Sequence, residues 1–177
     1  AGLTIGYREL FAIWDRDFLN AAHCGQRDYR EAFMEFMLSL GLSRGLVEEL
    51  AAASQAKARE LAAGLRPLPG VKQTLHRLHL SGLPMAVLSD SESPGSLLAV
   101  RLDALDIGGC FSAVISSRDL QCTKPAKACY DAAIAALGVD HAETAFVGHD
   151  AEELNGAKAA GLYTIAVNHE SDLLADW

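Results

Sequence analysis

The sequence predicts an α/β protein: a doubly wound, Rossmann-like parallel sheet that carries an all-helical cap insert. Three observations support this fold class. After residue 70, short apolar runs alternate with segments of helical periodicity, as expected where crossover helices join parallel strands. Before residue 66 the periodicity is helical throughout. The stretch Arg-Pro-Leu-Pro-Gly at 66–70 separates the two parts, because two prolines and a glycine cannot continue a helix.

Composition excludes several classes of protein. Of the 177 residues, 50% are hydrophobic and 21% are charged, which is enough apolar material for a packed core and excludes intrinsic disorder. Asp+Glu number 23 and Lys+Arg 15, so the net charge is −8. Because the basic residues form no cluster, we expect no nucleic-acid partner. No apolar run approaches the roughly 18 residues of a membrane span, so no membrane association is expected.

The cysteines indicate a cytoplasmic protein with reduced thiols. They stand at positions 24, 110, 122 and 129 and form no C-x-x-C pair. The first residues do not have the basic and then apolar layout of a secretory signal. Zinc is not expected, because none of the six histidines has ligand-like spacing from these cysteines.

The first helix is predicted over residues 7–22, where aromatic side chains recur every three or four positions and form one stripe. Asp15 and Asp17 lie beside the stripe, and they also permit another interpretation, a strand that ends in a D-x-D catalytic motif. The helical period favours the helix, as does Phe18 at a position where such a turn needs glycine. The aromatic stripe consists of Tyr7, Phe11, Trp14 and Phe18.

Two further helices complete the first part. One begins after Asp28, a suitable N-cap residue, and runs to Leu40, where Gly41 ends it. The other covers 45–65 and is rich in alanine. Because no strand is predicted in this part, we expect residues 5–66 to form a helical cap and residues 1–4 with 67–177 to form the α/β core.

The second part alternates helices with strands. The predicted strands are 84–90, 111–117, 144–148 and 163–167. Helices are predicted over 71–80, through 97–105, over 125–137 and over 152–161. Short apolar runs that end in polar residues are typical of buried parallel strands.

Polar residues follow the predicted strands at the edge where open α/β sheets bind ligands. Ser89 and Asp150 could each cap a helix, and Lys124 could be an exposed loop charge. Their joint placement at separate strand ends nevertheless favours one site. A hydroxyl and an ammonium suit phosphate oxygens, and carboxylates suit Mg²⁺. The candidate residues are Ser89, Asp90, Lys124, His149, Asp150 and Glu153.

Three segments resemble motifs of the haloacid dehalogenase (HAD) superfamily of hydrolases: AVLSD at 86–90, KPAKACY at 124–130 and AFVGHDAEELNGAKAAGL at 145–162. The resemblance covers nearly the whole chain, and residues 7–65 resemble the family's helical cap insert. It implies that Ser89 contacts the transferred group. It also implies that the amine of Lys124 neutralises the nucleophile and the phosphoryl oxygens, with Asp90 beside them in the phosphate site.

The chain departs from the family pattern at two motifs. The fourth motif usually has an aspartate after the glycine and another four residues later, where this chain has His149 and Glu153, with Asp150 between them. The resemblance implies Mg²⁺ bound by Asp150 and Glu153, with His149 as a further candidate ligand. The family's aspartate nucleophile ends its first strand. No such strand precedes residue 7, and residues 1–4 are interpreted as a remnant of its loop.

These observations predict a Mg²⁺-dependent phosphatase that acts on a small phosphorylated substrate through an aspartyl intermediate, its nucleophile missing from the sequence. Two alternatives stay open. His149 at the usual metal position favours a metal-free 2-haloacid dehalogenase, and the missing first motif favours a catalytically inactive binding module. Arg30 and His23 are candidates to reach the mouth of the site. Self-association into a homodimer through the aromatic stripe is a further alternative.

Overall fold

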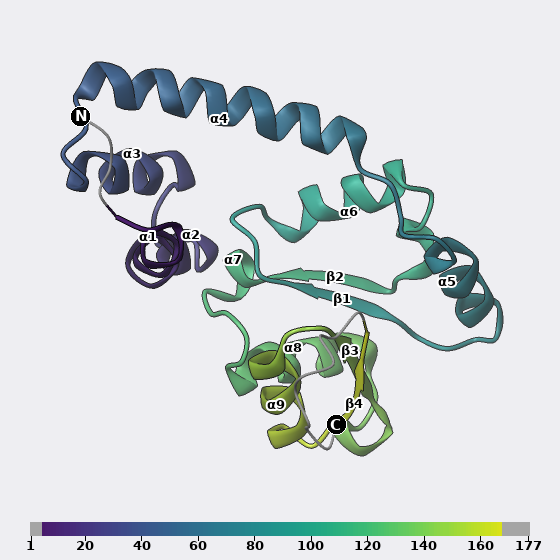
Figure 1. The fold of residues 1–177 in the computed structure, drawn as a ribbon. Helices are drawn as coiled ribbons and strands as arrows, with labels where there is room; N and C mark the ends of the chain where they lie inside the picture. Colours follow the sequence, from purple (N-terminus) through teal and green to yellow (C-terminus); the bar gives the residue numbers. More distant parts are fainter. Residues whose placement is uncertain (1–4, 168–177) are drawn as a thin grey trace.

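The computed structural model describes residues 5–167 (Figure 1). Residues 1–4, interpreted above as a loop remnant, lie outside the described residues. The described part begins with helices alone, and its first strand starts at Ala86. No helix within residues 5–167 has the length and apolar character needed to cross a membrane.

The first predicted helix is confirmed, and it contains a π turn that the sequence did not predict. Helix α1 (Tyr7–Trp14) continues through a π-helical turn (Asp15–Leu19) into α2 (Asn20–His23). The alternative strand with a D-x-D ending is wrong, because its two aspartates lie inside this turn. A π turn takes more residues per turn than an α-helix, which changes the direction in which the following side chains point.

Helices α3 (Tyr29–Ser39) and α4 (Arg44–Gly64) complete the first part, and in Figure 1 α4 runs from above α3 toward α6. Asp28 caps α3 as expected, with its Oδ1 accepting hydrogen bonds from two backbone N–H groups. The second half of the aromatic stripe packs against α3, whereas the side chains of Tyr7 and Phe11 are exposed. The rings in contact with Trp14 are those of Phe18, Tyr29, Phe33 and Phe36.

The predicted alternation of helices and strands is confirmed in order, with shifted boundaries. Helix α8 begins at Lys127 rather than at 125, because Ala126 has non-helical angles (φ −59°, ψ 130°). The short helix α7 was not predicted. The helices are α5 (Val71–Leu80), α6 (Gly95–Ala104), α7 (Ser117–Leu120), α8 (Lys127–Leu137) and α9 (Ala151–Ala159). The strands are β1 (Ala86–Ser89), β2 (Ala113–Ser116), β3 (Ala145–Gly148) and β4 (Tyr163–Ala166).

The strands form two parallel pairs. Strand β1 pairs with β2, with Ser89 opposite Ser116, and β3 pairs with β4, with Gly148 opposite Ala166. Within residues 5–167 no ladder joins the pairs, so the single continuous sheet expected from the sequence is divided there. Among the described residues, one edge of β1 and one edge of β3 therefore have no hydrogen-bonded partner strand.

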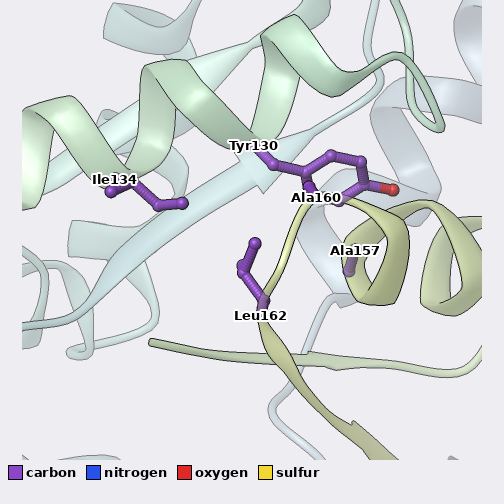
Figure 2. Packing of buried hydrophobic residues seen from close by; sticks show 5 residues of the cluster. All are labelled: Tyr130, Ile134, Ala157, Ala160 and Leu162. Carbon is purple, nitrogen blue, oxygen red and sulfur yellow. The ribbon is translucent and has the colours of Figure 1, made fainter. Parts of the chain in front are cut away.

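One hydrophobic cluster holds the two strand pairs in the same core. The cluster lies between α8 and the segment from α9 to β4 (Figure 2), and Leu88 of β1 and Phe146 of β3 both pack against it. The ring of Phe146 meets that of Tyr130 edge-on, with centroids 5.5 Å apart. The α/β fold class is therefore confirmed. The cluster consists of Tyr130, Ile134, Ala157, Ala160 and Leu162.

Helix α9 approaches the start of α8 closely at Gly156. A Cβ atom there would lie 2.5 Å from the Cβ of Pro125 and 2.8 Å from the hydroxyl of Tyr130. Only glycine fits this contact without a shift of the neighbouring groups, and Pro125 belongs to the loop that carries Lys124. Gly156 therefore sets the distance between α9 and that loop.

We predict that Gly156→Ala lowers the free energy of unfolding by about 1–3 kcal/mol, because overpacking forces its neighbours apart. Gly45→Ala is the matched control: nothing lies within 4 Å of a Cβ at this position in α4, so the exchange is neutral or stabilises by up to about 1 kcal/mol. Urea unfolding curves measure both effects. A Gly156→Ala variant as stable as the parent protein would contradict the close contact.

Candidate functional site

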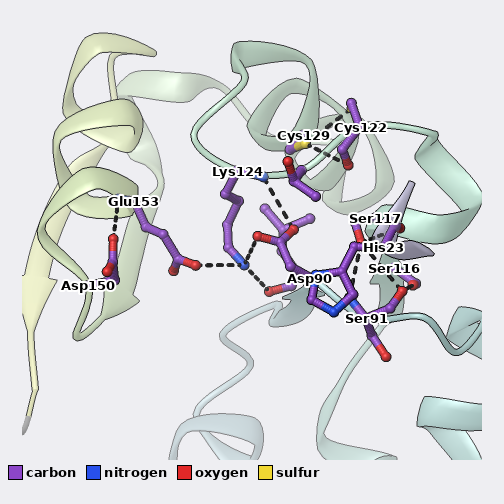
Figure 3. Close-up of polar contacts among 12 residues, drawn as sticks. His23, Asp90, Ser91, Ser116, Ser117, Cys122, Lys124, Cys129, Asp150 and Glu153 are labelled. Carbon is purple, nitrogen blue, oxygen red and sulfur yellow. Dashed lines mark hydrogen bonds and ion pairs between the residues drawn. The ribbon is translucent and has the colours of Figure 1, made fainter. Parts of the chain in front are cut away.

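The loop after β1 carries Asp90 and is held by buried serines (Figure 3). The backbone N–H of Ser91 donates to Oγ of Ser117 at 3.0 Å, and Oγ of Ser116 donates to the carbonyl of Ser93 at 2.7 Å. The hydroxyls of Ser116 and Ser117 are fully buried. Because buried polar groups are costly to leave unbonded, this network fixes the path of the loop and the position of Asp90.

Lys124 lies at the centre of the site. Its Nζ is 3.4 Å from Oδ2 of Asp90 and 3.2 Å from Oε1 of Glu153, and its side chain is only 5% exposed. The ammonium also donates to the carbonyl of Leu88 at 3.5 Å. The backbone N–H of Lys124 donates to the same Asp90 carboxylate at 3.2 Å. An almost buried ammonium needs such partners, so the loop after β1, the Lys124 loop and α9 converge on one charge.

Glu153 is positioned by the first turn of α9 and by α8. Asp150 is the N-cap residue of α9, and its Oδ1 accepts a hydrogen bond from the backbone N–H of Glu153 at 3.0 Å. The hydroxyl of Tyr130 donates to the carbonyl of Glu153 at 2.7 Å. Burial, together with the nearby Glu153 charge, raises the pKa of Tyr130 well above its usual range, so this hydroxyl remains a donor.

The structure brings together three of the six predicted site residues: Asp90, Lys124 and Glu153. Ser89 ends β1 opposite Ser116 and does not cap α6, whose N-cap residue is Pro94. Asp150 caps α9, as one interpretation of the sequence proposed, and His149 lies exposed between β3 and α9.

The expected magnesium ligands do not converge in this arrangement. Carboxylate oxygens are chemically suitable for Mg²⁺. However, Glu153 and Asp90 both point at the ammonium of Lys124, and one oxygen of Asp150 is used to cap α9. In the part of the chain from residue 5 to 167, no group of three histidine, cysteine or acidic side chains is placed to hold one ion. The residues as arranged do not fit a Mg²⁺ site, and no step below is derived through one.

A cavity of about 350 Å³ opens beside Lys124, between the N-terminal helices and the core. His23 lines it, as the sequence suggested, and Arg30 does not. Another hollow, of about 290 Å³ between α6 and β2, has Asp103 as its one ionisable lining residue. The cavity beside Lys124 is therefore the better candidate site. Its lining residues are Asp15, Arg16, Asn20, His23, Asp90, Thr123 and Lys124.

Sequence reasoning missed most of the residues that line this cavity. Arg16, Asn20 and His23 follow one another at spacings of four and three, which places polar groups on one side of the first helix. That spacing could have indicated a polar face on the helix. The sequence does not show what this face contacts, because Thr123 lies more than a hundred positions away: Oγ1 of Thr123 donates to Oδ1 of Asn20 at 3.0 Å.

A pair of thiols lies under the Lys124 loop. The sulfur atoms of Cys122 and Cys129 are 3.2 Å apart, and all four cysteines of the chain are free (Figure 3). Burial raises the pKa of Cys129 to about 12, with a further contribution from the hydrogen bond to Cys122. Cys129 is fully buried, whereas Cys122 is half-buried. The thiol of Cys129 is therefore protonated and shielded at neutral pH.

We predict that iodoacetamide at about pH 8 labels Cys122 in the native protein at least about tenfold faster than Cys129, since the thiolate is the reactive form. Peptide mapping by mass spectrometry measures the two rates. In denaturant both thiols should label at similar rates, which serves as the control. Equal labelling of the native thiols would show that Cys129 is neither buried nor raised in pKa.

A Rossmann-like core with an almost buried lysine between two strand-end carboxylates defines a class of α/β proteins that bind small ligands at the carboxyl ends of the strands. Comparison with known protein families identifies the family within this class. The model of the haloacid dehalogenase-like hydrolases matches residues 4–161, and the chain belongs to this family.

Curated relatives and solved structures agree with this assignment. The phosphoglycolate phosphatase of Pectobacterium atrosepticum is 33% identical over 99 residues, which is 56% of this chain and 42% of that protein. That of Escherichia coli strain K12 is 32% identical over 101 residues, which is 57% of this chain and 39% of that protein. This chain thus matches about two fifths of the length of these relatives.

Among solved structures, the similar ones include dehalogenases. The L-2-haloacid dehalogenase from Xanthobacter autotrophicus has a TM-score of 0.62 and 26% identity, over 93% of this chain and 67% of that chain. Another dehalogenase has a TM-score of 0.64 and 25% identity, over 96% of this chain and 76% of that chain. The fold is therefore shared with proteins of two different reactions.

Proposed function

We propose that the protein is a phosphatase-type hydrolase that acts on a small phosphate monoester at the cavity beside Lys124. One observation carries the proposal: an ammonium only 5% exposed is held between two carboxylates at the wall of a cavity of about 350 Å³. A cation held in this way can stabilise the charge that develops on a transferred phosphoryl group. The similarity to phosphoglycolate phosphatases supports this reaction and suggests 2-phosphoglycolate as the first substrate to test.

Position suggests that Lys124 binds a phosphoryl oxygen and that Asp90 and Glu153 hold its ammonium in place. The family resemblance suggests that the hydroxyl of Ser89 contacts the transferred group. An aspartate oxygen attacks phosphorus and the substrate alcohol leaves, after which water hydrolyses the aspartyl phosphate.

We further propose that residues 5–66 act as a cap over a core formed by residues 1–4 and 67–177. The cavity supports this division, because Asn20 and His23 line it from the helical side and Thr123 and Lys124 line it from the core side. A substrate bound between the two walls is shielded from bulk water, which strengthens the electrostatic contacts with Lys124.

We predict that Lys124→Met lowers the affinity for 2-phosphoglycolate, and the rate of phosphate release, by about a hundredfold or more. Lys127→Met is the matched control, since Lys127 is exposed and pairs only with Asp131 four residues along α8. Calorimetry measures binding, and a colorimetric phosphate assay measures turnover. Equal losses in both variants would remove Lys124 from its proposed role.

Dehalogenation of a 2-haloacid is the second candidate reaction, and two observations favour it. The expected magnesium ligands do not converge, and the solved dehalogenases match more than nine tenths of this chain. The same lysine could stabilise the carboxylate of a 2-haloacid.

Metal dependence separates the two reactions. For a phosphatase that uses magnesium, we predict that EDTA abolishes phosphate release and that added Mg²⁺ restores it. For a dehalogenase, chloride release from a 2-chloro acid continues unchanged in EDTA. If calorimetry finds no binding of phosphate esters, 2-haloacids or Mg²⁺ to the folded protein, the third hypothesis, a catalytically inactive binding module, is favoured.

A further inference from the structure

Asn20 is the first residue of α2, directly after the π turn, and it lines the cavity beside Lys124. Its side-chain oxygen is already in use. Oδ1 accepts a hydrogen bond from Oγ1 of Thr123 at 3.0 Å and a weaker one from the thiol of Cys24 at 3.9 Å. The contact with Thr123 holds the amide in place, and in the orientation that the structure gives it Oδ1 is the end in use. Its Nδ2 group, with two N–H donors, is the end left for a ligand.

The charged donors on this wall already face acidic partners, although Arg16 keeps further N–H groups beyond the two that it uses. The guanidinium of Arg16 makes two contacts with the neighbouring Asp17, at 2.6 and 2.7 Å, and its side chain is 73% exposed. The Nε2 atom of His23 faces Glu92 at 3.9 Å. Among the described residues of this wall, Asn20 therefore offers the donor that is both fixed in direction and not committed to a side-chain partner.

The charges around the cavity indicate which ligand this donor suits. Asp15 and Asp90 line the cavity, as do Arg16 and Lys124, so the formal charges cancel. A second phosphate opposite Lys124 would meet Asp15 and one neutral amide. A carboxylate carries a single charge, and one of its oxygens can accept a hydrogen bond from an N–H group of the amide. The cavity, at about 350 Å³, is near the lower limit of ligand sites and suits an acid of a few carbons.

We propose that Asn20 selects the substrate: its Nδ2 group donates to the carboxylate of a small organic acid whose reacting group lies at Lys124. This inference deepens the proposed function and rests on the same cavity. Thr123 acts as a positioning residue, since its hydroxyl fixes the amide of Asn20 and its backbone leads directly into Lys124. The π turn contributes by bringing Asn20 to the cavity side of the helix.

The test compares two ligands and three variants of this chain by calorimetry. Asn20→Asp keeps an oxygen for the hydroxyl of Thr123 but removes the donor, and Asn20→Ala removes the donor without adding charge. Asn155→Asp is the matched control, because Asn155 is exposed on α9 outside the cavity. The ligands are 2-phosphoglycolate and ethyl phosphate, which differ in the carboxylate.

We expect Asn20→Asp to weaken binding of 2-phosphoglycolate about thirtyfold or more and Asn20→Ala about tenfold, as for the loss of a hydrogen bond to a charged group. Binding of ethyl phosphate should change less than about twofold in Asn20→Ala, and Asn155→Asp should bind both ligands like the parent chain. Thermal unfolding of each variant confirms that the fold is kept.

The outcomes separate this inference from the proposed function. If 2-phosphoglycolate binding depends on Lys124 but is unchanged in Asn20→Ala, the role of Asn20 is wrong and the proposed function stands. Glycolate, which has the carboxylate but no phosphate, is titrated in addition. If it binds and its binding is lost in Asn20→Ala while neither phosphate ester binds, the carboxylate site stands and the phosphatase assignment is wrong. If Asn20→Ala weakens ethyl phosphate as much as 2-phosphoglycolate, Asn20 does not read the carboxylate and the inference is overturned.

Discussion

The site depends on how the almost buried ammonium of Lys124 is paired. Removing such a charge from water is costly unless partners surround it, and here Asp90 and Glu153 supply opposite charges from two separate elements. The pairing works only if the loop after β1, the Lys124 loop and α9 keep fixed distances. Much of the local structure serves this requirement: the buried serines hold the first loop, Asp150 caps α9, and Gly156 lets α9 approach Pro125.

The same lysine connects the divided sheet to the site. Its ammonium reaches the carbonyl of Leu88 at the end of β1 and the carboxylate of Glu153 after β3. These contacts join the carboxyl ends of two strand pairs that no ladder connects within the described residues. The two pairs also share an apolar contact, because Leu88 of β1 and Phe146 of β3 both pack against the hydrophobic cluster. One polar and one apolar contact therefore keep the two pairs in a single core.

Sequence reasoning predicted what depends on local pattern. Each strand was found from a short apolar run, and the rule that ligands bind at strand ends identified Asp90, Lys124 and Glu153 before any contact was known. It did not predict the π turn, because no residue type marks the insertion of one residue into a helix. It also missed Asn20 and Thr123, since their contact depends on how the N-terminal helices lie on the core. The sequence allowed Asp150 to be either the N-cap residue of α9 or a metal ligand. The structure shows it as the N-cap residue, with its carboxylate accepting a hydrogen bond from the backbone of Glu153.

The charge balance at Lys124 affects both candidate reactions. One ammonium beside Asp90 and Glu153 leaves a formal charge of −1, from +1 and −2, so an incoming anion is opposed as well as attracted. A phosphate monoester brings about two negative charges and meets twice the repulsion that a 2-haloacid, with one, would meet. Both anions are therefore opposed at this site, the phosphate monoester more strongly, and movement of Glu153 away from Lys124 would ease the binding of either one. Asp90 also accepts a hydrogen bond from the backbone N–H of Lys124, whereas among the described residues the Glu153 carboxylate faces only the ammonium, so Glu153 is the carboxylate that an incoming anion displaces more easily.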